Sequence, residues 1–157
     1  MSHKRAVLSP DLKEFIRLLG QHGVEFLVCG GHAVAFHGHP RLTMDLDLLI
    51  KPTPANARRL MSALRDFGFG DAGIPQAAFT KHGTAVTLGA QPNQIDLLTP
   101  TGQTDDDALF ANAVSGKIDG ISVRYLALTD LIKAKREAGR PKDLADLDEL
   151  AKLNPAE

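Results

Sequence analysis

The sequence from Cys29 to Ile50 reads CGGHAVAFHGHPRLTMDLDLLI, and this stretch decides the fold. The short apolar run over 26–29 leads into a pair of glycines, Gly30 and Gly31. Glycines interrupt regular structure, so we expect a strand to end at the pair. A short helix over 32–38 follows in our prediction, before a second apolar run begins.

Asp45 and Asp47 stand at alternate positions at the start of that second run, for which we predict a strand over 45–51. Side chains alternate across a strand, so both carboxylates lie on one face. Two carboxylates about 4 Å apart repel by about 4 kcal/mol at an effective dielectric of about 20. A cation between them relieves the repulsion, and hard oxygen ligands favour Mg²⁺ or Mn²⁺. With a glycine turn that can approach phosphate, the pattern indicates nucleotide chemistry.

Composition sets the broad class. A chain of 157 residues with 43% hydrophobic residues suits one domain with a real core. The formal net charge of −1 argues against a general polyanion binder. The single cysteine, Cys29, excludes an intrachain disulfide and suggests a reduced, cytoplasmic protein. No apolar run approaches the ~20 residues of a membrane span, so we expect no membrane partner.

The remaining elements follow from apolar periodicity and turn residues. We expect further helices over 10–19, 55–67, 105–110, 128–138 and 141–153, and further strands over 25–29, 85–88, 94–98 and 120–126. Their sum predicts an α+β (mixed α/β) fold with a small mixed sheet flanked by helices. We predict one domain over 1–157, with 128–153 as a helical pair packed on the core.

Asp96 is the third carboxylate of interest, because it stands alone between Ile95 and Leu97 in an apolar strand. A charge there needs a partner. It either joins Asp45 and Asp47 at a metal site or accepts a hydrogen bond at a strand end. The acids over 105–107, by contrast, suit a helix start and predict capping rather than metal binding.

The pair Gly30-Gly31, a spacer of thirteen residues and then Asp45-Leu46-Asp47 resemble the signature of the DNA polymerase β-like nucleotidyltransferase superfamily. The nearest resemblance is to the AbiEii-like and minimal nucleotidyltransferases of bacterial toxin–antitoxin and phage-defence systems. It implies a nucleotidyltransferase fold in which Asp45, Asp47 and Asp96 hold Mg²⁺ or Mn²⁺. It also implies that Gly30 and Gly31 approach the phosphates of a nucleoside triphosphate.

The residues flanking these motifs extend the resemblance. Arg41 and Thr43 fill the positions of an arginine and a hydroxyl residue just before the paired acids, and His32 directly follows the glycines. We therefore expect all three at the nucleotide. His32 also invites a zinc site with two later histidines, but their spacing fits no usual tetrahedral site.

A late stretch over 131–147 resembles the last motif of the AbiEii-like proteins, in which a helical lysine and an Arg/Lys-Asp pair face the nucleotide. Lys135 and Asp143 match those positions. Lys135 could neutralise triphosphate charge, and Asp143 or Asp146 could orient it. The alternative is a solvated basic helix paired with an acidic one.

The resemblance implies an enzyme that moves a nucleoside monophosphate from a nucleoside triphosphate such as ATP to an acceptor hydroxyl. The acceptor could be RNA such as a tRNA 3′ end, a protein or a small molecule. Catalysis would rest on Asp45, Asp47, Asp96 and Lys135. The alternative is a binding module with little catalysis that acts as a toxin or antitoxin partner. The larger AbiEii-like proteins carry a helical region beyond the position of Asp146, so acceptor recognition here is expected to need a homodimer or a partner.

Overall fold

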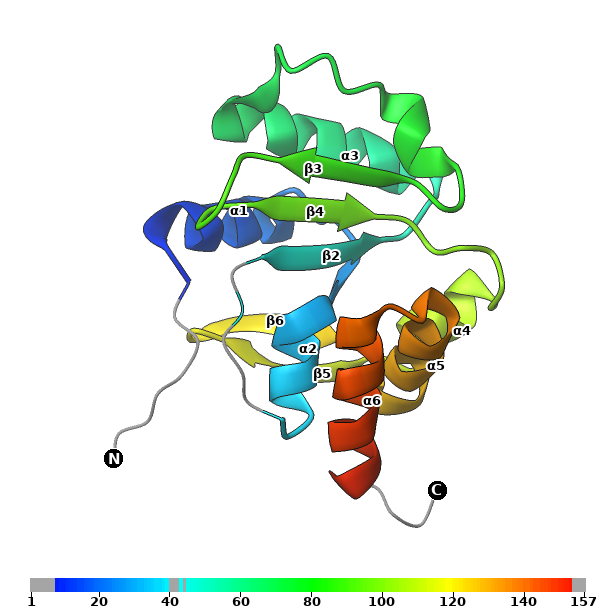
Figure 1. Ribbon diagram of the computed structural model, residues 1–157. Coiled ribbons are helices and arrows are strands. Elements are labelled where there is room, and N and C mark those ends of the chain that lie inside the picture. The colour runs from blue at the N-terminus through cyan, green and yellow to red at the C-terminus, as the bar shows by residue number, and fades with distance from the viewer. Residues whose placement is uncertain (1–7, 40–42, 44, 154–157) are drawn as a thin grey trace.

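A single mixed sheet organises the computed structural model, which describes residues 8–39, 43 and 45–153. Within that part of the chain the sheet has six strands in the order β3-β4-β2-β1-β6-β5 (Figure 1). The strands are β1 (Phe26–Cys29), β2 (Leu46–Ile50), β3 (Ala85–Leu88), β4 (Ile95–Leu98), β5 (Val114–Ile118) and β6 (Ile121–Tyr125). The central pairs are β1 antiparallel to β2, β2 parallel to β4 and β1 parallel to β6, while hairpins form both edges.

Six α-helices surround the sheet in the described residues. They are α1 (Pro10–Gln21), α2 (Gly30–Phe36), α3 (Pro54–Leu64), α4 (Asp106–Ala111), α5 (Leu128–Ala138) and α6 (Pro141–Leu153). A π-helical turn, Arg65–Phe69, extends α3, and a 3₁₀ helix, Gln76–Thr80, precedes β3. The Ser9 hydroxyl caps α1 by accepting from the Leu12 N–H at 3.2 Å. Asp105 caps α4, as predicted, by accepting from the Asp107 N–H at 3.1 Å.

The helices divide between the two faces of the sheet: α1 and α3 lie on one, and α2, α5 and α6 on the other (Figure 1). Strand β2 is buried at alternate positions, with Leu46, Leu48 and Ile50 all 0% exposed. Burying each such side chain stabilises the fold by about 1.5–3 kcal/mol. The intervening residues, Asp47 and Leu49, therefore point to the face of α2, α5 and α6. This structure confirms the predicted α+β fold with a mixed sheet flanked by helices.

The sequence patterns predicted neither the 3₁₀ helix Gln76–Thr80 nor strand β5. Strand β5 is the larger omission, because it forms an edge of the sheet. It pairs with β6 through the turn at Asp119 and Gly120, whose φ angles are 49° and 83°. An Asp-Gly pair is a strong hairpin signal, but β5 itself contains Gly116 and lacks a clear apolar alternation. A Cβ atom at Gly116 would lie 2.6 Å from the Phe36 ring, which stacks on Tyr125 with a centroid distance of 3.9 Å. Packing against α2 thus explains the glycine that weakened the strand pattern.

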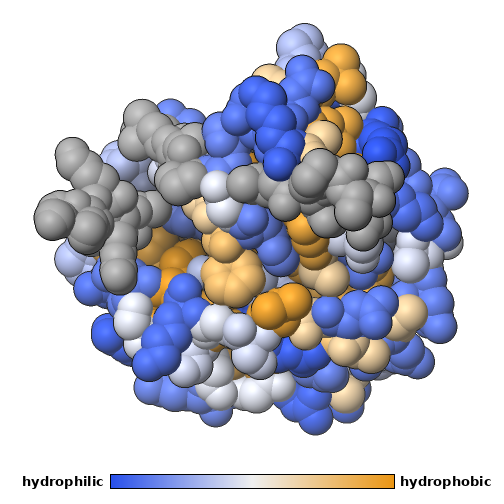
Figure 2. Space-filling view, turned by 90° about the horizontal axis from the view of Figure 1, so that it is seen from below, coloured by the Kyte–Doolittle hydropathy of each residue, from blue (hydrophilic) through white to orange (hydrophobic). Residues whose placement is uncertain are grey.

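The surface is mostly hydrophilic in the view from below, with hydrophobic groups gathered near its centre (Figure 2). The large hydrophobic side chains that are exposed in the described residues are Phe36, Val114 and Leu144. Among the helices that the structure describes, none has the length and apolar character needed to cross a membrane.

Candidate active site

Four strands place polar side chains in one row on the face of the sheet that carries α2, α5 and α6. In the pairing register Cys29 lies opposite Asp47, Asp47 opposite Asp96, and Asp96 opposite Thr87. Paired positions in a sheet project to the same side. The Thr87 hydroxyl donates a hydrogen bond of 2.7 Å to Asp96 Oδ1. Two predicted site residues, far apart in sequence, are therefore direct neighbours across β2 and β4.

Asp45 joins this row through the side chain of Gln94. The Gln94 amide nitrogen donates to Asp45 Oδ2 at 3.3 Å and lies 3.2–3.3 Å from both Asp96 carboxylate oxygens. Gln91 donates to Asp45 Oδ1 at 3.1 Å. Within residues 8–39, 43 and 45–153, no three His, Cys, Asp or Glu side chains meet as a group arranged to hold a metal ion. The Gln94 amide therefore bridges Asp45 and Asp96, two of the three carboxylates that the sequence predicts for the site.

Burial and neighbouring carboxylates both disfavour the charged form of Asp47. Burial, followed by the hydrogen bonding and charge of Asp96 and the charge of Asp45, raises the pKa of Asp47 to about 7. The charge of Lys142 opposes these effects by favouring the charged form of the carboxyl. A cation among the three carboxylates would remove the repulsion, so the donor set suits a hard divalent ion.

Gly30 brings the start of α2 directly against Asp47. Its φ of 64° lies in the left-handed region, and a Cβ atom there would lie 1.9 Å from Asp47 Oδ2. Gly31 follows as a buried residue of the same helix. The two glycines therefore provide both a backbone turn and the space that the Asp47 carboxylate occupies.

Helices α5 and α6 supply the opposite wall through a buried cluster of charges. Lys135 Nζ lies 3.4 Å from Asp143 Oδ1 and 3.0 Å from Asp146 Oδ2, and all three residues are buried. Arg140 donates from Nε to Asp143 Oδ2 at 2.7 Å. Burial alone would raise the pKa of Asp143, but the hydrogen bonds and charge of Arg140 and the charge of Lys135 outweigh it and lower that pKa.

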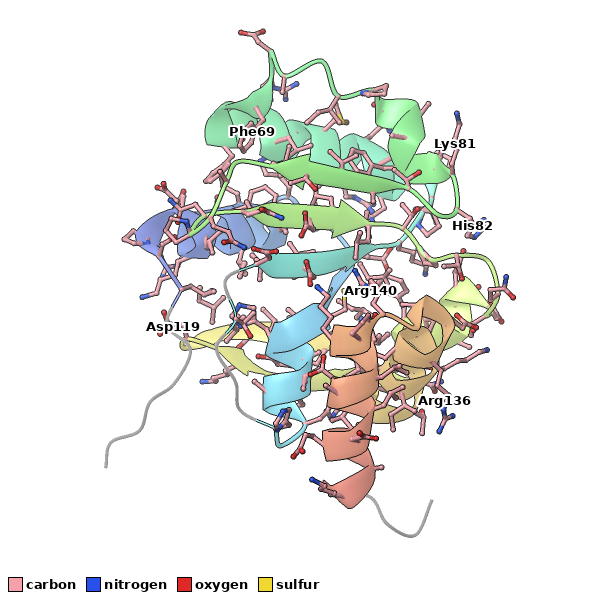
Figure 3. All side chains as sticks on the ribbon, viewed as in Figure 1. Phe69, Lys81, His82, Asp119, Arg136 and Arg140 are labelled. Atoms are coloured by element: carbon pink, nitrogen blue, oxygen red, sulfur yellow. The ribbon has the colours of Figure 1, made fainter. Side chains whose placement is uncertain are left out.

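Two cavities occupy the space between the walls. The smaller has a volume of about 160 Å³, and its lining includes Gly30, Asp45, Asp47, Gln91, Arg140 and Lys142. The larger, of about 360 Å³, runs between the sheet and α5, and its apolar lining includes Leu49, Leu98, Leu109, Leu126 and Leu131. Both cavities are lined by Gly30, Asp47, Lys135 and Arg140, so they adjoin. In Figure 3, Arg140 lies between the start of α6 and strand β2.

The structure also describes three other residues that the sequence predicts for the site: Gly31, His32 and Thr43. Gly31 and Thr43 line the smaller cavity, and His32 is buried in α2 at 7% exposure. Arg41 lies outside the described residues. His37, one of the histidines in the zinc alternative, has Nε2 2.8 Å from the Leu126 carbonyl oxygen.

Five further residues belong to the site although the sequence did not predict them there: Thr87, Gln91, Gln94, Arg140 and Lys142. The position of Gln94, two residues before Asp96, was a usable signal, because alternation places both side chains on one face. Lys142 directly precedes Asp143 and fits the Arg/Lys-Asp pair of the late motif, which was a usable signal, whereas nothing local distinguishes Arg140 from a residue of a solvated basic turn.

Comparison with known proteins identifies the family and the fold of the chain. The family model described as "Nucleotidyl transferase of unknown function (DUF2204)" matches residues 8–157, so the chain belongs to that family. This confirms the resemblance to nucleotidyltransferases at the level of the superfamily. No curated protein matches the chain.

Three solved structures share the fold. ANT(2″)-Ia, in complex with adenylyl-2″-tobramycin, has a TM-score of 0.59 at 12% identity over 90% of this chain and 86% of its own. An antigenic nucleotidyltransferase-like protein from Paracoccidioides brasiliensis has a TM-score of 0.57 at 20% identity, over 97% and 79% respectively. A candidate nucleotidyltransferase from Thermotoga maritima has a TM-score of 0.60 at 13% identity, over 96% and 99%. At these identities the likeness concerns the fold alone.

Proposed function

We propose that this member of the DUF2204 family transfers a nucleoside monophosphate from a nucleoside triphosphate to an acceptor hydroxyl in a metal-dependent reaction. Family and fold support nucleotidyl transfer in general. One observation carries the finer proposal: Asp47, the register partner of Asp96 on the sheet, lines one cavity together with Asp45 and the cations Arg140 and Lys142. Carboxylates on one wall and cations on the other suit a metal-bound polyphosphate.

Asp45, Asp47 and Asp96 would hold Mg²⁺ or Mn²⁺. Their oxygens are hard ligands, and the burial that chiefly raises the pKa of Asp47, with the nearby charges of Asp96 and Asp45, disfavours a charged carboxylate that a divalent cation would stabilise. When bound, the metal would supply Lewis-acid stabilisation of the charge on the transferring phosphoryl group.

The chain's own residues would bind the triphosphate and move the acceptor proton. Arg140 and Lys142 extend into the smaller cavity and would balance phosphate charge. Lys135 lines the same cavity, but its ammonium group already lies between two buried carboxylates. We therefore assign Lys135 first to positioning α6, with Asp143, and only second to the phosphates. Gly30, Gly31 and Thr43 would line the phosphate path, with His32 behind them.

Asp96 would accept the proton of the attacking hydroxyl, while Thr87 and Gln94 hold the carboxylate in place. The acceptor oxygen would form a bond to the α-phosphorus, and the bond from that phosphorus to the bridging oxygen of the β-phosphate would break. Pyrophosphate leaves, and the proton of the acceptor passes to Asp96. The larger cavity, with its leucine lining, would take the nucleoside.

The experiment is a search for label transfer from each of the four α-³²P nucleoside triphosphates with Mg²⁺. Three acceptor pools should be tried: total tRNA, soluble protein, and hydroxyl-bearing small molecules such as aminoglycosides. The aminoglycoside arm is motivated by the adenylylated tobramycin bound to ANT(2″)-Ia. Transfer by the wild type that Asp47→Asn and Asp96→Asn abolish, while the exposed Asp71→Asn retains it, would support the proposal. A folded wild type that transfers no label to any pool would contradict it.

The alternative of a binding module, acting as a toxin or antitoxin partner, is supported by none of the observations above. The preferred nucleotide and the acceptor stay predictions that the label-transfer search addresses.

A further inference from the structure

Gln94 is a neutral side chain that reaches two of the three site carboxylates. Its amide nitrogen lies 3.3 Å from Asp45 Oδ2 and 3.2 Å from Asp96 Oδ2. Its backbone is fixed as well, because its carbonyl oxygen accepts from the Leu46 N–H at 3.0 Å. Gln94 is half-buried and precedes β4, on the same side of the chain as Asp96. The side chain is therefore held over the carboxylates by both the sheet and its own hydrogen bonds.

The chemistry of a primary amide suits this place in two opposite ways. Its N–H groups donate to carboxylates, and its carbonyl oxygen is a hard ligand of the kind that Mg²⁺ and Mn²⁺ accept. A half-turn about the last side-chain torsion exchanges the two ends, and that torsion is broad and roughly two-fold. An amide that bridges two carboxylates through N–H can thus turn its oxygen to a cation held between the same two groups.

We propose that Gln94 is a reversible member of the metal site, and this inference rests on the proposed function. Without metal its N–H groups hold Asp45 and Asp96 together against their repulsion. With metal bound, its oxygen faces the cation and completes the set of oxygen donors. Gln94 is then a positioning residue that keeps the carboxylates spaced for the cation in both states.

A second glutamine, Gln91, allows a test of whether the bridging position of Gln94 matters or whether any amide near the carboxylates is enough. Gln91 is exposed and donates a hydrogen bond to one site carboxylate, at Asp45 Oδ1. If any amide near the carboxylates supported metal binding, removal of either glutamine would weaken that binding equally. If the bridging position matters, removal of Gln94 should weaken metal binding much more than removal of Gln91.

The test is calorimetric titration of Mn²⁺ alone into wild type, Gln94→Ala, Gln94→Glu, Gln94→Lys and Gln91→Ala, each checked for folding by circular dichroism. We expect Gln94→Ala to weaken Mn²⁺ binding by about tenfold, as the loss of a supporting oxygen at a metal site does. Gln94→Glu should strengthen binding, because it adds a fourth carboxylate. Gln94→Lys should abolish binding, since it tethers a cation beside Asp45 and Asp96. Gln91→Ala should weaken binding less than Gln94→Ala does, because Gln91 donates to a single carboxylate.

A second readout follows the amide itself. The side-chain ¹⁵N–H₂ signals of Gln94, assigned by their loss in Gln94→Ala, should shift on addition of Mg²⁺, whereas those of the exposed Gln103 should not. Unchanged or tighter Mn²⁺ binding by Gln94→Ala would overturn the inference while leaving the proposed function standing, provided that Asp47→Asn loses the ion. A wild type that binds no Mn²⁺ would overturn both.

Discussion

Two clusters of charged side chains face each other across the smaller cavity, and they handle charge in opposite ways. On the sheet, the carboxylates of Asp47 and Asp96 are neighbours with amide and hydroxyl partners, and the pKa of Asp47 rises to about 7. On α5 and α6, Asp143 and Asp146 share the ammonium group of Lys135, and the pKa of Asp143 falls. The pKa of a buried aspartate thus rises where its nearest charged neighbours are other carboxylates, and falls where cations outweigh the effect of burial.

This difference suggests that one cluster stabilises the fold, while the other binds the ligands of the site. The α5–α6 cluster contains its own counter-charges and needs no ligand to be stable. The sheet cluster consists of carboxylates that a divalent cation could pair with, and under the proposed function it would gain that cation with the substrate. Single substitutions in either cluster should therefore reveal which of the two roles that cluster has.

The largest expected effect is on stability, from loss of the buried lysine. Lys135→Met keeps the aliphatic stem but leaves the carboxylates of Asp143 and Asp146 buried without their shared cation. We expect a loss of about 3–5 kcal/mol in the free energy of unfolding, because breaking a buried ion pair on one side strands a charge. Urea denaturation at pH 7 measures it.

The control for that variant is Lys152→Met, which removes an exposed ion pair with Glu149 and should leave the urea midpoint unchanged. If Lys135→Met were as stable as this control, the α5–α6 cluster would not be the self-balanced structural element described here.

The two glycines Gly30 and Gly139 allow a matched comparison between the clusters, since both have a φ of 64°. In Gly139→Ala the new Cβ atom has its nearest contact at 3.7 Å, so the variant has only the strain of a left-handed backbone. It should lower the free energy of unfolding by about 1–2 kcal/mol. Gly30→Ala adds a collision with Asp47 Oδ2 and should cost about 1–3 kcal/mol more. It should also weaken metal binding, which Gly139→Ala should not. Thermal unfolding and Mn²⁺ titration of both variants check this; equal losses would contradict the close approach of Gly30 to Asp47.

Asp47 should make the protein less stable as pH rises when divalent cations are absent. The native carboxyl keeps its proton up to about pH 7, whereas the unfolded one, with a pKa of about 3.9, loses it earlier. The native state therefore binds more protons between about pH 4 and 7, and stability falls across that window as pH increases.

Asp47→Asn removes this dependence and should be more stable than wild type by about 2 kcal/mol at pH 8, and equal to it at pH 4. Denaturant titrations in EDTA at the two pH values measure the difference. Asp71→Asn should show none. A wild type whose stability rises between pH 4 and 8 more than that of Asp47→Asn would contradict the unbalanced sheet cluster.

The smallest effect on stability should come from Arg140→Gln. The Arg140 side chain is 61% exposed, so its ion pair with Asp143 should contribute less than about 1 kcal/mol. Affinity for a Mg²⁺–nucleoside triphosphate complex should nevertheless fall by about tenfold, because a charge-assisted phosphate contact is lost. Arg136→Gln is the matched control, since Arg136 points away from the site (Figure 3). Equal binding by the two variants would place Arg140 outside the phosphate path.

Local patterns predicted most of the elements and the nomination of Asp45, Asp47 and Asp96, because alternation and glycine punctuation are visible within a few residues. They could not show that Asp47 and Asp96 are register partners, since that pairing joins strands nearly fifty residues apart. Periodicity also could not tell which face of α5 is buried, and so whether Lys135 faces solvent, phosphate or two carboxylates. Strand β5 was lost because Gly116 serves the packing of Phe36, a tertiary requirement with no local signal.

The central claim is that the carboxylates on β2 and just before it hold a cation for nucleotide binding. Its most direct test is calorimetric titration of ATP, CTP, GTP and UTP, with and without Mg²⁺, into wild type and the double variant Asp45→Asn/Asp47→Asn. The account predicts binding of at least one nucleotide that requires Mg²⁺ and disappears in the folded double variant. Nucleotide binding that survives both the removal of Mg²⁺ and the loss of the two carboxylates would contradict it.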